Sequence, residues 1–265
     1  MQLKKKLIFK TYLSFLKFYG KYKRKNPSLV PTINLSTSKT SRFLYILTKI
    51  ISSQFHTIIQ KQMSFYTKNH QELEAVQEPL GVAVWLEFIM NTENLEGDIL
   101  ELGAYKGGMT VVSADFLQNI SSRRKIYACD SFTGIPYEDK FSNVKNSKGR
   151  FGDTSKEYVQ KKVQKFNLVE KVELISGLFE DTLYQKLSEQ KFSLVLLDCD
   201  VYDATKFALD FAYPRLAKHG IIMLDDYERA YTEKPLWGAT KAINEFAEKN
   251  NLIINTFPDN YIIKK

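Results

Sequence analysis

The stretch LVLLDCDVYDAT at residues 194–205 runs four consecutive apolar residues directly into Asp198, with Asp200 two positions later. An uninterrupted apolar run of this length is typical of a strand that is covered on both faces, as in a parallel sheet. A buried ionised carboxylate is costly unless something compensates its charge. The two aspartates are therefore expected at the carboxyl end of the strand, where a cation can reach them.

The pattern extends in both directions along the chain. Five short apolar segments are strand candidates: 98–103, 125–130, 171–176, 192–198 and 220–226. Helical patterns separate most of them and follow the fifth: 107–119, 155–166, 180–189, 203–216 and 238–249. LIINTF at 252–257 and NYIIKK at 260–265 add two final strand candidates. This alternation predicts an α/β fold with a doubly wound, mostly parallel, seven-stranded Rossmann-like sheet covered by helices on both faces.

Charge divides the chain into two regions. Residues 1–70 hold 14 of the 38 Lys and Arg residues and no Asp or Glu, whereas residues 71–265 hold all 30 acids and 24 basic residues. We therefore predict a basic helical N-terminal arm or lid segment over 1–70 and the main domain over 71–265. The net negative charge of the main domain disfavours a nucleic-acid partner.

The first 25 residues, MQLKKKLIFKTYLSFLKFYGKYKRK, place apolar side chains at near-helical intervals among lysines. This segment is too short and too charged to span a bilayer. Two interpretations stay open: a basic helix that lies on an anionic membrane surface as a peripheral contact, or a helix that docks on the acidic domain or on a second subunit of a homo-oligomer. Residues 26–41 are expected to be a linker, followed by helices over 43–65 and 71–91, the second of which is interrupted by Pro79.

Cys129 and Cys199 are the two cysteines, and both lie in apolar runs rather than in the paired spacing of a disulfide framework or a zinc site. They are expected to be small core residues of a protein in a reducing compartment. We therefore predict a cytoplasmic location, with the peripheral membrane contact as an addition to it.

The first strand candidate leads into ELGAYKGG at residues 101–108, where Gly103 and Gly107 precede a helix. Glycine is needed where the backbone turns sharply or lies close to a ligand, because a Cβ would block the turn or the contact. The spacing is not that of the G-x-G-x-x-G fingerprint, so a plain tight turn remains the alternative. Asp130 ends the second strand, where it can accept hydrogen bonds from both ribose hydroxyls of a nucleoside or simply form a turn.

SGLFEDT at residues 176–182 closes the third strand candidate. Gly177 again allows a sharp turn, and the apolar pair Leu178 and Phe179 could hold an adenine ring. Phe179 alone would be interpreted as a core residue. Its position at a strand end, in line with Asp130, favours the ligand.

Acidic residues end the fourth and fifth strand candidates. Side chains alternate along a strand, so Asp198 and Asp200 can project to the same side. Asp198 with Asp225 and Asp226 offers three hard carboxylates from two neighbouring strand ends, which suits Mg²⁺; Ca²⁺ and Mn²⁺ are also admissible. The alternative is that Asp226 caps a following helix.

A long polar connection over residues 131–153 follows the second strand candidate. Loops of this length in compact domains are usually functional or disordered, so we interpret it as a cover of the active site. Its end, Thr154 to Glu157, resembles a capping box that opens the next helix.

These motifs resemble the class I S-adenosylmethionine-dependent methyltransferases, and more closely the macrocin O-methyltransferase (TylF-like) family, over about residues 72–265. The resemblance rests on the segments GDILELGAYKGG, IYACDSFTGIP, LISGLFEDTL, FSLVLLDCDVYDATKFALDFAYPRLAKHGIIMLDDY and GATKAINEF. The order of the acidic strand ends is its most specific part. Lys106 stands where this family more usually has arginine, and KHGII has one glycine where two are common.

The resemblance implies a methyltransferase that uses S-adenosylmethionine and Mg²⁺ or another divalent cation to methylate a hydroxyl of a sugar-containing small molecule or glycan. It implies that Glu101, Gly103 and Gly107 surround the methionine end of the cofactor, Asp130 binds its ribose, and Gly177 and Phe179 flank adenine. It further implies that Asp198, Asp225 and Asp226 hold the metal and that Asp200 is the general base. A catechol or phenolic O-methyltransferase, and a non-catalytic cofactor-binding or membrane-associated scaffold, are the alternatives.

Overall fold

The computed structural model describes residues 55–142, 147–227, 237–256 and 259–265. The expected linker at 26–41 and most of the expected helix at 43–65 lie outside these ranges. The chain divides into two compact units, Met1–Gln60 and Lys61–Lys265. The second unit carries the strands and the site described below, whereas the division at residues 70 and 71 stays a prediction.

One sheet organises the second unit, with the strand order β3-β2-β1-β4-β5-β6. Its strands are β1 (Asp98–Leu102), β2 (Ile126–Asp130), β3 (Val172–Ser176), β4 (Phe192–Leu197), β5 (Leu216–Leu224) and β6 (Tyr261–Ile263). The first five pair in parallel and β6 pairs antiparallel with β5. The predicted doubly wound α/β fold is confirmed, with six strands in the described ranges rather than seven. The LIINTF segment contributes an isolated bridge between Asn255 and Tyr261 instead of a strand, and Pro258, which has no N–H to donate, follows it closely.

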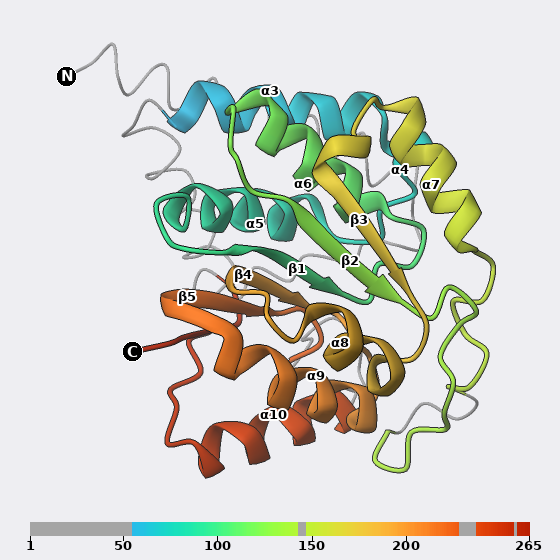
Figure 1. Ribbon diagram of the computed structural model, residues 1–265, viewed down its shortest axis with the longest axis vertical. Helices are drawn as coiled ribbons and strands as arrows, with labels where there is room; N and C mark the ends of the chain where they lie inside the picture. The colour runs from blue at the N-terminus through green and yellow to red at the C-terminus, as the bar shows by residue number, and fades with distance from the viewer. Residues whose placement is uncertain (1–54, 143–146, 228–236, 257–258) are drawn as a thin grey trace, which may run out of the picture. The chain divides into compact units, whose positions relative to one another are not determined.

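Helices cover both faces of this sheet, as Figure 1 shows, with α5, α6 and α7 on one face and α8, α9 and α10 on the other. The helices are α3 (Phe55–Lys68), α4 (His70–Leu73), α5 (Pro79–Asn91), α6 (Gly108–Asn119), α7 (Lys156–Lys165), a 3₁₀ turn (Val169–Lys171), α8 (Phe179–Leu187), α9 (Tyr202–Arg215) and α10 (Trp237–Lys249). The helices predicted from the alternating pattern are therefore present within one or two residues of their expected bounds.

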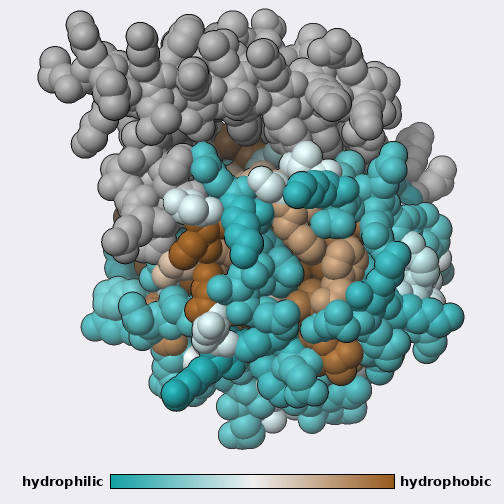
Figure 2. Space-filling view, turned by 90° about the horizontal axis from the view of Figure 1, so that it is seen from above, coloured by the Kyte–Doolittle hydropathy of each residue, from teal (hydrophilic) through white to brown (hydrophobic). Residues whose placement is uncertain are grey.

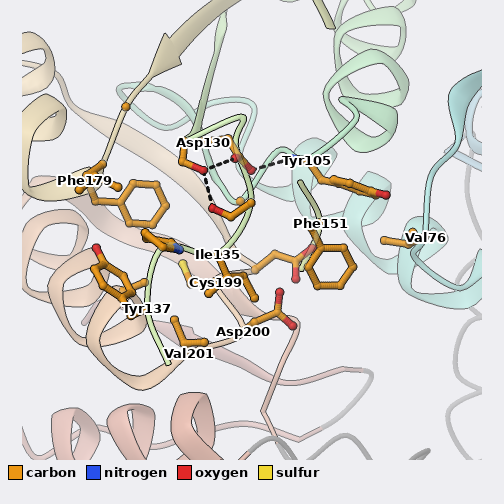
Figure 3. Close-up of a pocket in the computed structure, with 18 residues that line it drawn as sticks. Val76, Tyr105, Asp130, Ile135, Tyr137, Phe151, Phe179, Cys199, Asp200 and Val201 are labelled. Atoms are coloured by element: carbon orange, nitrogen blue, oxygen red, sulfur yellow. Dashed lines mark hydrogen bonds between the residues drawn. The ribbon is translucent and has the colours of Figure 1, made fainter. Parts of the chain in front are cut away.

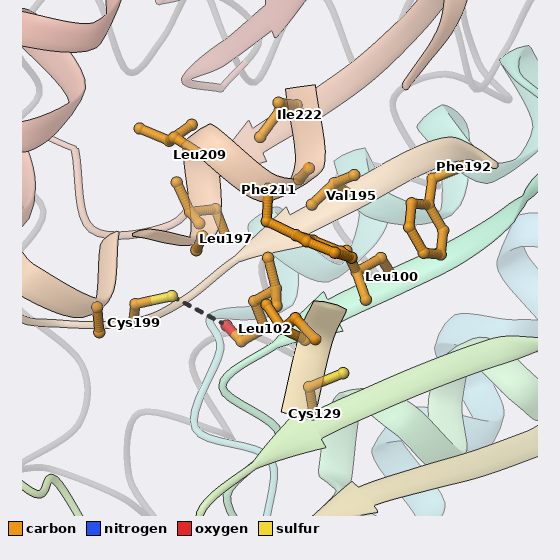
Figure 4. Close-up of a cluster of buried hydrophobic side chains, with 14 of the residues drawn as sticks. Leu100, Leu102, Cys129, Phe192, Val195, Leu197, Cys199, Leu209, Phe211 and Ile222 are labelled. Carbon is orange, nitrogen blue, oxygen red and sulfur yellow. Dashed lines mark hydrogen bonds between the residues drawn. The ribbon is translucent and has the colours of Figure 1, made fainter. Parts of the chain in front are cut away.

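The central strands are buried because their side chains are apolar on both faces. All six residues of β4 are buried. Figure 4 shows Val195 and Leu197 of β4 beside Leu100 and Leu102 of β1, with Phe211 of α9 packed against them. Full burial of such a side chain contributes roughly 1.5–3 kcal/mol, so this cluster fixes β1 against β4. The ends of these two strands contribute to the site described below.

Over the described part of the face in Figure 2, hydrophilic side chains predominate and hydrophobic ones gather in separate patches. Such a mixed surface is ordinary for a folded domain. Among the helices of the described ranges, none combines the length and the apolar character required to cross a bilayer.

Candidate functional site

The site lies at the carboxyl ends of the parallel strands, where the strand order reverses between β1 and β4. In such sheets the chain leaves the two central strands in opposite directions, which opens a crevice. A cavity of about 790 Å³, its open mouth included, occupies this place. The turns after β1, β2, β3 and β4 line it together with the loop 131–153, as the close-up in Figure 3 shows.

Gly103 brings the end of β1 against β4. Its φ is +102°, and a Cβ at this position would lie 1.7 Å from the backbone oxygen of Asp198. The Asp198 amide donates to Leu102 O at 2.9 Å, which locks the two strand ends together. Gly107, with φ +72°, precedes α6 and lies against Val159. Both predicted glycines are thus required by conformation and by close packing, and Gly103 lines the cavity.

Asp130 lies at the end of β2 and faces the cavity (Figure 3). Its Oδ2 accepts from the Tyr105 amide at 2.8 Å and its Oδ1 from the Phe132 amide at 2.7 Å. Burial raises the pKa of Asp130, and these two hydrogen bonds oppose that rise. The Ser131 hydroxyl lies 3.4 Å from Oδ1 as a further donor, so the carboxylate is held in one orientation beside the cavity.

The turn after β3 forms the far end of the cavity. Gly177 adopts φ +135°, and Phe179 begins α8 with its ring directed into the cavity in Figure 3. Tyr137 and Ile135, from the loop 131–153, lie on the opposite side of the same space. The Tyr137 hydroxyl donates to Glu180 Oε1 at 2.5 Å and so joins the loop to α8. This end of the cavity is therefore a slot between apolar walls, suited to a flat ring.

Glu101 is buried, with 3% of its surface exposed. Thr110 Oγ1 donates to its Oε2 at 2.6 Å. Burial raises the pKa of Glu101 to about 8; the hydrogen bond from Thr110 opposes the rise, and the charges of Asp198 and Asp130 add to it. Glu101 lines a small second cavity that also borders Gly103 and Asp198. A ligand ammonium placed there would stabilise the charged form of the side chain.

Three aspartates gather beside the main cavity. Asp198, Asp200 and Asp226 each place a carboxylate oxygen within 4.8 Å of the others. The Asp200 amide donates to Asp226 Oδ2 at 2.7 Å. Burial raises the pKa of Asp226 well above its usual range, and the charges of Asp200 and Asp198 raise it further. Three carboxylates this close repel one another, and a hard divalent cation is the ligand that such an oxygen set fits.

The composition of this cluster differs from the predicted ligand set. Asp198 and Asp226 lie together as expected, but the third member is Asp200, whereas Asp225 lies outside the group. Asp200 has φ +60°, a left-handed conformation that is uncommon for aspartate. Strained backbone of this kind is concentrated at functional sites. The turn at Asp200 folds the chain back toward Asp226, and strand alternation alone did not indicate it.

The loop 131–153 contributes to the cavity on both sides of its four undescribed residues, 143–146. Ile135 and Arg150 are hydrogen-bonded through their backbones at 2.9 Å, which closes the loop on itself. Phe151 contacts Tyr105 edge to face with ring centroids 5.1 Å apart, and both rings border the cavity. The position of these residues agrees with the interpretation of this loop as a cover.

Sequence reasoning missed the segment between α4 and α5. Val76 lines both cavities, and Gln77 Nε2 donates to Asp198 Oδ2 at 2.6 Å. No motif marks this segment. Val76 is 48% exposed in the folded chain, which its place between Ala75 and Gln77 in the sequence does not indicate.

Comparison with known proteins gives a family match. The sequence model of the macrocin-O-methyltransferase (TylF) family matches residues 84–256, which is more than half of the chain. Mycinamicin III 3''-O-methyltransferase of Micromonospora griseorubida is 29% identical over 145 residues, which are 51% of this chain and 57% of that protein. An 8-demethyl-8-(2,3-dimethoxy-alpha-L-rhamnosyl)-tetracenomycin-C 4'-O-methyltransferase of Streptomyces olivaceus is 27% identical over 143 residues, or 51% and 54% of the two chains. The chain thus spans little more than half the length of these curated relatives.

Solved structures share the fold. The O-methyltransferase NovP superposes with a TM-score of 0.58 at 22% identity, over 70% of this chain and 78% of its own. CalS11, a calicheamicin methyltransferase, superposes with a TM-score of 0.60 at 18% identity, over 87% and 94% of the two chains. On the sequence match over residues 84–256, this chain belongs to the macrocin-O-methyltransferase (TylF) family.

Proposed function

We propose that this chain is an S-adenosylmethionine-dependent O-methyltransferase that uses a divalent cation to methylate a hydroxyl of a sugar-containing acceptor. The observation that carries the proposal is one juxtaposition: the cavity along the ends of β1, β2 and β3 opens beside the aspartate cluster after β4 and β5. A methyl donor in the cavity would meet an acceptor held at the cluster.

The cofactor would occupy the cavity in a defined direction. Asp130 would accept hydrogen bonds from the ribose hydroxyls, and Gly177 and Phe179 would flank the adenine ring. Glu101 and Gly103 would lie at the amino-acid end, since Glu101 lines the small cavity and Gly103 lines both cavities; Gly107, which precedes α6, stays a predicted member of this group. Bound there, S-adenosylmethionine supplies an electrophilic methyl group.

The aspartate cluster fits a divalent cation. Asp198 and Asp226 are the ligands supported by both the sequence and the geometry, and Asp225 stays a predicted third ligand. Mg²⁺, Mn²⁺ and Ca²⁺ all accept such oxygen sets. A cation at this place lowers the pKa of a bound hydroxyl and fixes its position.

Asp200 would then act as the general base. Its carboxylate lies with the other two aspartates, and the Asp200 amide is held by Asp226 at 2.7 Å, so the side chain has a fixed place at the cavity wall. An aspartate so placed can accept the hydroxyl proton as the oxygen attacks the methyl carbon. The loop 131–153 and Phe151 would cover the reacting groups and exclude water.

The sugar acceptor is inferred from the relatives. The name of one curated relative specifies 4'-O-methylation of a rhamnosyl-bearing tetracenomycin, and that of the other 3''-O-methylation of mycinamicin III. A second subunit and a peripheral membrane contact through the basic residues 1–70 stay predictions.

Calorimetry and turnover test the proposal together. We expect S-adenosylhomocysteine to bind the full chain, and methyl transfer to glycosylated acceptors to require Mg²⁺ and to stop in chelator. Asp198→Asn should abolish turnover but leave S-adenosylhomocysteine affinity nearly unchanged. Full activity of this variant in chelator would contradict the metal-dependent scheme, and activity on catechols alone would replace the sugar acceptor by a phenolic one.

A further inference from the structure

Gln77 makes a contact with the aspartate cluster that no motif indicated. Its side-chain amide donates to Asp198 Oδ2 at 2.6 Å, across 121 residues of sequence. Gln77 lies in the segment between α4 and α5, and it borders the small cavity that Asp198 also lines. The first predicted metal ligand is therefore held by a residue from a different part of the fold.

The backbone on either side of Gln77 is fixed. The Tyr66 hydroxyl donates to Gln77 O at 2.9 Å, and Tyr66 is completely buried. Two residues earlier, Ala75 lies directly against the start of α6: a Cβ on Gly108 would lie 2.5 Å from Ala75 Cα. These contacts hold the backbone at residues 75–77 in place, so the side-chain amide of Gln77 is positioned in the ligand-free structure. It therefore orients the Asp198 carboxylate through the hydrogen bond between them.

The chemistry of the donor is suited to a metal ligand. A neutral amide N–H orients a carboxylate and leaves its negative charge in place, whereas a lysine would form an ion pair and compete with the cation. Lys106 borders the same small cavity, but it forms ion pairs with Glu74 at 3.2 Å and Asp153 at 2.7 Å. Lys106 is thus engaged by these two acids, and the donor to Asp198 from this segment is the neutral amide of Gln77. Hydrogen bonds that orient ligands in this way commonly contribute 10- to 100-fold, roughly, to metal affinity.

We propose that Gln77 is a positioning residue that presents Asp198 to the divalent cation. The inference rests on the metal-dependent function proposed above. It assigns to the segment between α4 and α5 a direct part in building the metal site, although this segment supplies no ligand itself.

Titration of the full chain with Mn²⁺ alone, by calorimetry without cofactor or acceptor, tests the role independently of turnover. Gln77→Leu removes the donor at similar volume, and we expect its Kd for Mn²⁺ to rise roughly 10- to 100-fold. Gln77→Met, an unbranched replacement, is the second variant for the case in which the leucine variant folds poorly. In turnover assays, saturating metal should restore most of kcat in both variants, a recovery that mere loss of folded protein would not show.

Gln62→Leu is the matched control. Gln62 likewise donates to a carboxylate, Asp115 Oδ2, at 2.9 Å; it is buried, whereas Gln77 is half-buried, and it lies on α3 and contacts α6. Its loss should leave the Kd for Mn²⁺ unchanged. If Mn²⁺ binds the wild type and the folded Gln77 variants equally well, the inference is overturned while the proposed function stands. If the wild type binds no Mn²⁺ or Mg²⁺, the metal-dependent function itself fails.

Discussion

At the scale of single residues, Glu101 is an acid whose ionised form is destabilised by its surroundings in the site. Its side chain is buried, the charges of Asp198 and Asp130 act on it, and Thr110 donates a hydrogen bond to it. The surroundings favour the neutral acid, so the pKa stands near 8 in the folded chain. Residues with such raised pKa values are concentrated at functional sites, because a ligand is expected to supply the missing positive charge.

The pH dependence of stability follows from this shift. The folded pKa lies above the unfolded one, so the folded state holds a proton that the unfolded state has lost between pH 4.5 and pH 8. Stability is therefore fully present below the unfolded pKa and decreases as pH rises toward 8. Without cofactor, we expect the free energy of unfolding of the wild type to fall by about 2–3 kcal/mol more than that of Glu101→Gln when the pH rises from about 5 to about 7. Urea unfolding of both proteins at the two pH values measures the difference, and parallel pH profiles would show that Glu101 is ionised in the folded chain.

At the scale of elements, the loop 131–153 is attached to the helices of the opposite side of the site. Asp139 lies against the first turn of α10, where a Cβ on Gly238 would fall 1.7 Å from Asp139 Oδ2. Phe141 packs on Tyr202 of α9 with ring centroids 4.5 Å apart. A carboxylate at a helix N-terminus is stabilised by the helix dipole. These two contacts join the loop to α10 and α9.

Gly238→Ala should release this attachment, because the new methyl group and the Asp139 carboxylate cannot occupy the same space. We expect amides of residues 135–141 to exchange about tenfold faster, while those of β1 and β4 stay protected. Hydrogen exchange followed by mass spectrometry measures both regions at once. Lys148→Ala, at an exposed position of the same loop, is the control and should leave exchange unchanged. Unaltered exchange at 135–141 in the glycine variant would mean that Asp139 does not hold the loop.

At the scale of the whole molecule, the boundary between the N-terminal arm and the main domain can be located by comparing the free energies of unfolding of shortened chains. Tyr66 and Gln62 of α3 are buried against the main unit, with Gln62 donating to Val112 O at 3.0 Å and Tyr66 to Gln77 O at 2.9 Å. A chain that starts at residue 55 keeps these contacts, whereas one that starts at residue 71 loses both.

We expect residues 71–265 to unfold in urea with a free energy about 5 kcal/mol below that of residues 55–265, or not to fold. The expected loss exceeds the 3–5 kcal/mol, roughly, of one deleted buried aromatic, because a buried amide is lost with it. Equal stability of the two shortened chains would support the division at residue 70 that the charge pattern predicts.

The sequence by itself determined the strands, the helices between them and the edge of the sheet at which the acids gather. These features depend on local patterns: apolar runs specify buried strands, and parallel strands necessarily bring their carboxyl ends to one edge. The start of α7 was predicted to within one residue. The capping-box pattern predicted Thr154 as the N-cap, whereas in the structure Ser155 is the N-cap and accepts a hydrogen bond from the Tyr158 amide.

Only the tertiary structure decided which side chains meet at that edge. The register pairs Leu197 with Leu224 and so sets Asp198 level with Asp225, but the chain turns after both strands, and these turns bring Asp200 and Asp226 to Asp198 instead. The contact of Gln77 with Asp198 likewise depends on how α3 and α6 hold a segment that has no pattern of its own. Strand alternation ends where the strand ends, and beyond it the position of a side chain is set by turns and long-range packing that no local period encodes.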